Sequence, residues 1–271
     1  MTSDPVEFRE RVAGFLRRDP LRHTALSTAV NNEISGLAIA DAPSYFASVH
    51  ADDVVGVAMR TGRRGVWLGD VPIGAVPTLV TRFAELVPRI DDVHGPENVA
   101  RPFAANWSVL RGNTYRAEPG SRLYRLGQLR MPAASGSARR ATEADIALCR
   151  AWLADMAREL GEAHLAMSEA AIRARIVAGR YWLWEADGRP VGLAAHQVPV
   201  DGWARIGPVY TPPQTRGRGH ASALVAEVSR MLRAAGDEVC LYTDIANPTS
   251  NKIYRAIGFE AVADEVRYAF E

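Results

Sequence analysis

The sequence predicts a mixed α/β protein of two domains, each built on a mostly antiparallel sheet flanked by helices. Three observations predict this fold class. The chain has 271 residues, close to the length of two average domains. Strand-like and helix-like segments alternate along it, and the order of these segments recurs about halfway. Hydrophobic residues make up 48% and charged residues 23%, which is typical of packed globular chains and excludes disorder.

The first half opens with a helix that has clear terminal signals. Asp4 is a suitable N-cap, Pro5 stands at the first helical position, and Asp19-Pro20 ends the segment. The other elements expected here are a helix over 26–32, strands over 45–50, 54–60 and 66–69, helices from 77 and over 97–110, and a closing strand over 123–129.

Residues 131–138 are small, uncharged and turn-forming, which is typical of a linker. We therefore expect domains at residues 1–130 and 139–271. In the second half, Asp187-Gly188 predicts a hairpin turn. The elements expected around it are helices over 146–160 and 168–178, strands over 181–185, 190–197 and 204–210, a helix over 220–235, a strand over 239–243, a helix over 250–257 and a strand over 266–270.

The two halves share an order of elements. In each, a strand, an acidic turn and a second strand are followed by a third strand and a helix. The identical residues recur 136 positions apart, as Tyr45 and Tyr181, Val55 and Val191, Gly56 and Gly192, and Ala58 and Ala194. Identical residues in short apolar strands are common by chance. The inference that the halves have related folds therefore rests on the shared order of elements.

Charge and cysteine content exclude several classes of protein. The 32 basic residues nearly balance the 31 acidic ones, which argues against a nucleic-acid binder. Cys149 and Cys240 have no metal-like spacing and fall in apolar segments, so we expect two buried thiols and no metal site. The charged N-terminus has no signal-peptide core, and no run approaches the roughly 18 apolar residues of a membrane span. We therefore expect a cytoplasmic protein without membrane contact.

The most informative stretch lies between the strand over 204–210 and the next helix. It reads Gln214-Thr215-Arg216-Gly217-Arg218-Gly219-His220. Glycines let the backbone approach a ligand, and helix-start amides favour an anion such as a pyrophosphate. Arg216 and Arg218 can add charge-assisted contacts. The dinucleotide and P-loop fingerprints are excluded because the third glycine and the Lys-Ser/Thr pair are missing. The alternative is a tight turn with solvated arginines.

A second stretch follows one helix and one strand later, with Asn247, Tyr254 and Gly258-Phe259. With these residues the chain resembles the GCN5-related N-acetyltransferase (GNAT) superfamily. The turn matches its Gln/Arg-x-x-Gly-x-Gly/Ala signature, and the later residues match its Asn-x₆-Tyr-x₃-Gly-Phe pattern. The resemblance covers residues 139–271 well and reaches the first half only through the repeat.

The resemblance implies two GNAT-like domains in tandem, the second transferring an acetyl group from acetyl-CoA to a primary amine of a small molecule or peptide. The co-substrate would lie between the strand before the turn and the strand after the helix. Residues implied to bind it are Val209, Tyr210, Thr211, Gln214, Arg216, Gly217, Arg218, Gly219, His220, Ala221, Ser222, Asn247, Asn251 and Tyr254. The Tyr254 hydroxyl would also donate a proton to the departing thiolate. The alternative for Tyr254 is a core tyrosine.

The general base is not specified by the pattern. Many superfamily members carry a glutamate on the strand before the turn, whereas the segment 204–209 holds no carboxylate. Candidates are His196, Asp244 and Glu162, of which His196 has a suitable intrinsic pKa. His196 is alternatively a packed strand residue and Asp244 a backbone-bonding one. A water relay, or an amine that arrives neutral, would need no base.

The first half lacks the motifs of the second. Its counterpart of the turn, residues 69–77, has no arginine and no Gly-x-Gly before the helix. We expect a degenerate GNAT-like domain that does not hold CoA. A non-catalytic acyl-CoA-binding regulatory or scaffold protein is the alternative function, and homodimer formation is left open.

Overall fold

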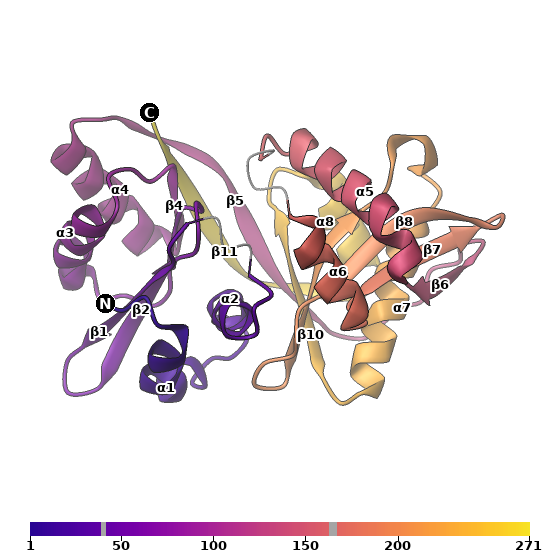
Figure 1. The fold of residues 1–271 in the computed structure, drawn as a ribbon, viewed down its shortest axis with the longest axis horizontal. Coiled ribbons are helices and arrows are strands. Elements are labelled where there is room, and N and C mark those ends of the chain that lie inside the picture. Colours follow the sequence, from indigo (N-terminus) through magenta and orange to yellow (C-terminus); the bar gives the residue numbers. More distant parts are fainter. Residues whose placement is uncertain (39–41, 163–166) are drawn as a thin grey trace. The chain divides into compact units, whose positions relative to one another are not determined.

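The computed structural model describes residues 1–38, 42–162 and 167–271, and they form two compact units (Figure 1). Unit 1 comprises Met1–Leu123, Asp244–Ala246 and Ala263–Glu271. Unit 2 comprises Tyr124–Thr243 and Asn247–Val262. Each unit combines a mixed sheet with helices, so the predicted fold class is confirmed.

Unit 1 alternates short strands with helices. Its helices are α1 (Pro5–Leu16), α2 (Thr24–Ile34), α3 (Val76–Leu86) and α4 (Glu97–Arg111), and its strands are β1 (Tyr45–His50), β2 (Val54–Arg60), β3 (Val66–Leu68) and β4 (Asp92–Gly95). Strands β1, β2 and β3 pair antiparallel in order, and β3 pairs with β4 in parallel. The Asp4 side chain accepts hydrogen bonds from the Val6 and Glu7 amides, as its predicted capping role requires.

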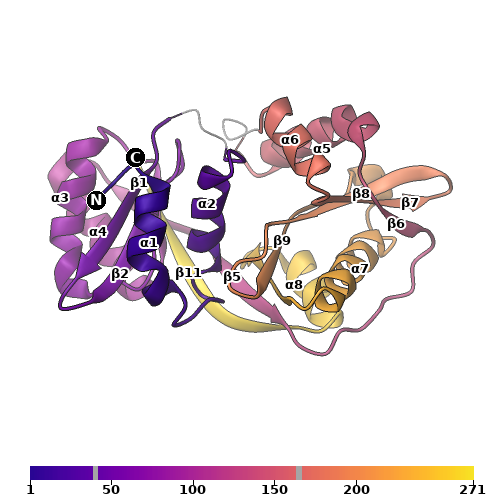
Figure 2. The same cartoon turned by 60° about the horizontal axis from the view of Figure 1, so that its bottom comes forward.

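Helices cover both faces of the unit 1 sheet (Figure 2). The apolar side chains of α3 and α4, among them Phe83 and Phe103, form one core layer with strand residues such as Ala58 and Val93. Helices α1 and α2 pack on strand residues such as Phe46, which lies on the other face. This separation follows from the alternation of side chains along each strand.

Unit 2 also combines helices with a sheet. Its helices are α5 (Ile146–Glu159), α6 (Glu169–Val177), α7 (His220–Ala234) and α8 (Pro248–Ala256), and its strands are β6 (Ser137–Arg140), β7 (Tyr181–Ala186), β8 (Arg189–His196), β9 (Trp203–Tyr210) and β10 (Glu238–Asp244). The strand order is β10-β9-β8-β7-β6. Only the β9–β10 pair in this order is parallel; the β6–β7, β7–β8 and β8–β9 pairs are antiparallel.

Alternate residues of β7 point to opposite sides of this sheet. Trp182 and Trp184 join the layer that α7 covers, whereas Tyr181 and Leu183 join the layer under α5 and α6 (Figure 2). Cys149 and Cys240 are both buried free thiols, which confirms the expectation for the two cysteines.

Strands β5 (Tyr115–Leu126) and β11 (Phe259–Phe270) each contribute to both units. In unit 1, β11 pairs with β4, and Tyr268 and Phe270 join the core of that unit. In unit 2, the Gly127 amide donates to the Gly258 carbonyl at 2.9 Å. The division therefore differs from the one expected at 1–130 and 139–271, because two twelve-residue strands, each about 40 Å long, begin in one unit and end in the other. The expected linker over 131–138 lies inside unit 2 and runs into β6.

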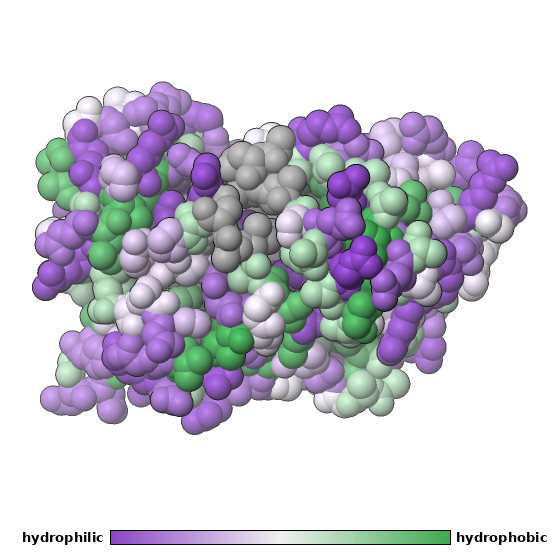
Figure 3. Space-filling model, viewed as in Figure 1, coloured by the Kyte–Doolittle hydropathy of each residue, from purple (hydrophilic) through white to green (hydrophobic). Residues whose placement is uncertain are grey.

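Among the described residues, no helix has the length and apolar character that crossing a membrane requires. Figure 3 shows hydrophilic side chains interspersed with hydrophobic ones over both units on the face that it presents. This mixed pattern is ordinary for an exposed protein surface.

Candidate active site

The parallel pair β9 and β10 separates partway along its length. Residues Trp203 to Ile206 pair with Glu238 to Leu241, and no ladder in the described chain continues from Gly207 to β10. Beyond that point β9 pairs with β8, as Ala194 with Val209 and Leu193 with Tyr210. A Cβ atom at Gly207 would meet nothing within 4 Å. The backbone edge from Gly207 to Tyr210 that faces away from β8 is therefore open to a ligand.

The glycine-rich turn follows β9 directly and leads into α7. Gly217 has φ +77° and Gly219 has φ +78°, conformations that residues with a Cβ atom adopt at a cost. Gly219 is the N-cap of α7 and supplies no side-chain cap, so the first amides, from His220 to Ser222, keep their hydrogen-bonding capacity. These donors lie at the positive end of the helix dipole, which favours an anion.

The two arginines of the turn differ in their contacts. The Arg216 guanidinium forms an ion pair with Glu159 of α5 at 2.7 Å and donates to the Thr211 carbonyl at 2.8 Å. Tyr210 also donates to Glu159, at 3.1 Å. Arg216 holds the pKa of Glu159 below its usual value, with a smaller contribution from Tyr210. The Arg216 side chain, expected on a phosphate, thus fastens the turn to α5, whereas Arg218 is exposed and has no ion pair in the described part of the chain.

Four other residues expected at the co-substrate lie in or next to this turn. Gln214 is exposed within a short 3₁₀ turn, Pro213–Thr215. The Thr211 hydroxyl and the His220 Nδ1 atom are buried and have no hydrogen-bond partner among the described residues. Val209 lies on β9 at the open edge and packs partly on the layer under α7.

Tyr254 lies on α8, close to the helix start that Asn247 caps by accepting from the Ser250 amide. The side chain is 8% exposed, and its ring packs on Phe259 and Tyr124 at centroid distances of 6.0 and 6.4 Å. Burial raises the pKa of Tyr254 to about 12. The phenol therefore stays protonated at neutral pH and can donate its proton.

Asn251, expected to touch the co-substrate, has its side chain engaged inside the protein. It is 4% exposed, accepts from the Tyr124 hydroxyl at 2.9 Å and donates to the Asn247 carbonyl at 2.7 Å. Tyr124 is a residue that the sequence did not single out. Tyr124 reaches α8 from β5. Its partner Asn251 is 127 positions away, so no local pattern could reveal this contact.

The candidate bases occupy three different settings. His196 ends β8 opposite Ile206, where β9 and β10 are still paired, and its Nδ1 atom lies 3.0 Å from the Gln197 carbonyl. Burial lowers the pKa of His196, so the imidazole is neutral at physiological pH. The Asp244 carboxylate is exposed and accepts from the Ala246 amide at 2.7 Å, as the backbone-bonding alternative expects. Glu162 lies half-buried just after α5.

The corresponding strands of unit 1, β3 and β4, stay together where β9 and β10 separate. Trp67 pairs with His94, and their rings stack at 5.5 Å. A Cβ atom at Gly95 would lie 2.8 Å from the Leu68 carbonyl, so the strands touch at the position where a slot would open. Phe103 stands seven residues after the N-cap of α4, as Tyr254 does after that of α8, and it offers no hydroxyl.

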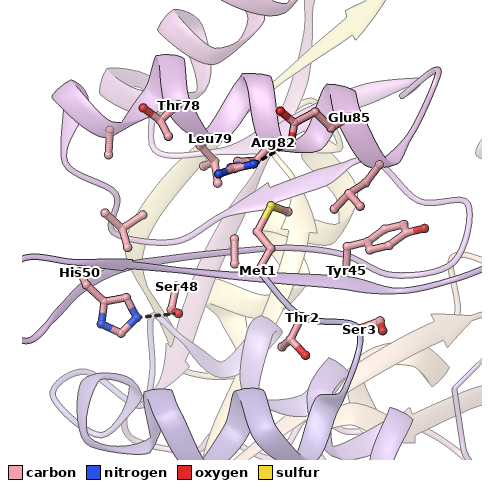
Figure 4. Close-up of a pocket in the computed structure, with 14 residues that line it drawn as sticks. Met1, Thr2, Ser3, Tyr45, Ser48, His50, Thr78, Leu79, Arg82 and Glu85 are labelled. Carbon is pink, nitrogen blue, oxygen red and sulfur yellow. Dashed lines mark hydrogen bonds and ion pairs between the residues drawn. The ribbon is translucent and has the colours of Figure 1, made fainter.

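Unit 1 holds a cavity of about 780 Å³ between β1 and α3 (Figure 4). Several of the polar side chains around it pair with one another. Arg82 donates to Glu85 at 2.9 Å, and the His50 ring lies 2.9 Å from the Ser48 hydroxyl. In the described residues no group of three or more His, Cys, Asp or Glu side chains could hold a metal ion.

Comparison with known proteins finds similarity in sequence and in structure. Residues 186–268 match the family model described as FR47-like protein. A segment of 58 residues is 34% identical to "Uncharacterized protein YkzC" of Bacillus subtilis and spans 41% of that relative. An acetyltransferase of the GNAT family from Colwellia psychrerythraea is similar in structure, with a TM-score of 0.57, 12% identity and coverage of 91% of this chain and 97% of that one.

Two further solved structures agree. A GCN5-related N-acetyltransferase from Kribbella flavida has a TM-score of 0.57 and 18% identity, covering 88% of this chain and 93% of its own. A tandem GNAT protein from the clavulanic acid biosynthesis pathway has a TM-score of 0.55 and 14% identity, covering 97% and 94%. The resemblance drawn from the motifs is confirmed: the chain has the fold of the GCN5-related N-acetyltransferase superfamily, the fold that these acetyltransferases use, and its residues 186–268 match the FR47-like family.

Proposed function

We propose that unit 2 transfers an acetyl group from acetyl-CoA to a primary amine by direct attack. The observation that carries the proposal is the separation of β9 and β10 immediately before a glycine turn at the uncapped start of α7. An extended thioester arm fits along an open strand edge, and a pyrophosphate fits on helix-start amides.

The side chains needed for this chemistry are few. The amine nitrogen forms a bond to the acetyl carbon, the C–S bond breaks, and its electron pair leaves on sulfur. Tyr254 gives its proton to that thiolate. A backbone amide near Val209 or Tyr210 stabilises the oxyanion that forms on the way. The surplus proton of the amine passes to a base and on to solvent, which later reprotonates Tyr254.

His196 is the base that we propose first. Its neutral imidazole can accept a proton, and it lies beside the strand position at which β9 and β10 separate. Asp244 accepts from the Ala246 amide, which makes its carboxylate less suited to the role. Glu162 is the third candidate, and a water relay or an amine that arrives neutral would need no base.

We also propose that unit 1 does not bind CoA. Close contact of β3 with β4 at Leu68 and Gly95, the missing arginine in the segment 69–77, and Phe103 in the place of a tyrosine support this. Any effect of unit 1 on the reaction would then pass through the strands that it shares with unit 2.

Two measurements on the full chain test the function. Calorimetry should detect acetyl-CoA binding, and free-thiol release should accelerate when a panel of primary amines is added. Tight binding without amine-dependent release would favour the acyl-CoA-binding regulatory or scaffold protein instead. Absence of binding would remove both functions.

A further inference from the structure

Arg180 occupies a defined place between α6 and β7. Gly179, with φ +69°, ends the helix, and the Arg180 amide donates to the Arg175 carbonyl at 3.0 Å, closing the helix end. The Arg180 carbonyl accepts from the His196 amide at 3.1 Å. Arg180 therefore lies directly beside the end of β8.

The Arg180 side chain is a buried cation without a counter-ion. It is 8% exposed, and its Nη1 atom is buried and has no hydrogen-bond partner among the described residues. No salt bridge of Arg180 occurs in the part of the chain that the structure describes. Burying a charge without a partner is costly, so an anion would be expected to complete such a site.

Two arginines near Arg180, Arg175 and Arg140, are also cationic, whereas the Asp237 carboxylate acts on the neighbouring His196. Burial, and then the charge of Arg175, lower the pKa of the Arg180 guanidinium. Arg140 lies close to Gly179, with its Nη1 atom 3.1 Å from the position a Cβ there would take, and its guanidinium lies 5.2 Å from the centroid of the Trp182 ring. Both Arg180 and Arg140 act on His196, whose pKa is lowered mainly by burial. A ligand that neutralises this region must carry negative charge.

This region lies at the inner end of the proposed slot. His196 pairs with Ile206, the last residue of β9 that is paired with β10, and the Gln197 side-chain Nε2 donates to the Gly207 carbonyl at 3.2 Å. Arg180 on the β7 side and Ile206 on β9 are thus two strand spacings apart, roughly 10 Å. The glycine turn follows Tyr210 at the other end of β9. The Arg180 backbone therefore lies within the length of a small acceptor from the inner end of the slot.

We propose that Arg180 binds an anionic group of the acceptor, so that the acceptor is a small amine that also carries a carboxylate or a phosphate. The inference rests on the proposed acetyl transfer. A guanidinium forms two parallel hydrogen bonds with either anion, which fixes the far end of the molecule while the amine approaches the thioester. Arg180 would be the specificity-determining residue and Arg140 a second source of positive charge.

Matched acceptors test this on the full chain. Glycine and β-alanine are compared with their amides, and phosphoethanolamine with ethanolamine, by kcat/KM in thiol release. The anionic member of at least one pair should have the higher kcat/KM. The pair with the larger preference shows whether the site takes a carboxylate or a phosphate. Arg180→Gln should lower kcat/KM for that acceptor by at least about 30-fold, the loss expected for one partner of a buried charge pair. Its Kd for acetyl-CoA should stay within about twofold, and the exposed Arg189→Gln should behave as the unaltered chain does.

A stability measurement gives a second readout that does not depend on turnover. Removing an uncompensated buried charge should leave the urea midpoint of Arg180→Gln equal or higher, and inorganic phosphate should raise the melting temperature of the unaltered chain more than that of the variant. A clear loss of stability in Arg180→Gln would show a structural arginine and overturn the proposal. Equal use of neutral and anionic amines would overturn it too while leaving acetyl transfer standing. Acetyl-CoA that neither binds nor reacts would instead refute the proposed function, with the phosphate response still deciding the anion site.

Discussion

At the scale of single residues, the proposed chemistry depends most on the hydroxyl of Tyr254. Burial raises its pKa to about 12, so the phenol keeps its proton across the physiological range. We expect Tyr254→Phe to lower kcat by about 100-fold, since a positioned acid commonly contributes 10²–10⁴. The Kd for acetyl-CoA, measured by calorimetry, should change little because the ring remains. Unchanged kcat would leave Tyr254 as a core residue beside Phe259 and nothing more.

The Tyr124 hydroxyl is a second residue with a specific expected effect. It donates to Asn251, whose amide in turn holds the Asn247 carbonyl at the start of α8. Tyr124→Phe leaves a buried acceptor without a donor, so the free energy of unfolding should fall by about 1–2 kcal/mol. Tyr115→Phe on the same strand is the matched control, because the Tyr115 hydroxyl has no hydrogen bond in the described residues. Equal urea midpoints for the two variants would contradict the role given to Tyr124.

At the scale of elements, two glycine variants distinguish a loss of acetyl-CoA binding at the turn from a general effect of backbone strain. Gly217→Val places a branched side chain at φ +77°, and the backbone must move away from the proposed pyrophosphate site. We expect acetyl-CoA binding to be lost while circular dichroism shows an intact fold. Gly188→Val is the control: this hairpin glycine has φ +70° and equally open surroundings, so it should lose similar stability and keep its affinity. Unchanged affinity in Gly217→Val would refute the assignment of the turn.

The elements that the sequence predicted well are those specified by nearby residues. Strands β1, β2 and β7 follow from short runs rich in apolar and aromatic residues next to short turns. Strand β4 was missed because Asp92-Val93-His94-Gly95 is short and holds one large apolar residue; it becomes a strand through pairing with β3 and β11. The outer parts of β5 and β11 were missed for the same reason. The site residues fall into the same two groups. The need for glycine in the turn is specified by nearby residues, whereas the partners of Arg216 and Asn251 lie on other elements.

At the scale of the whole molecule, the expected linker is a poor place to separate the halves. Residues 263–271 belong to unit 1, where Arg267 pairs with the buried Asp92 at 2.8 Å and Tyr268 and Phe270 enter the core. Tyr124 and Leu126, which precede the linker, belong to the core of unit 2. Each half as read from the sequence therefore lacks side chains that complete one core, although the elements within it resemble a full domain.

A fragment experiment tests this directly. Fragments 1–130 and 139–271 produced separately should each lack a cooperative unfolding transition in urea, because each misses a core strand or exposes one without its partner. Produced together, they should associate and regain the acetyl-CoA affinity of the full chain. The control is the full chain carrying a protease site within residues 131–136, which precede β6; cutting there after folding should leave both units folded, since the cut breaks no strand. A fragment 139–271 that unfolds cooperatively alone and binds acetyl-CoA with full affinity would show that the shared strands are dispensable to the site.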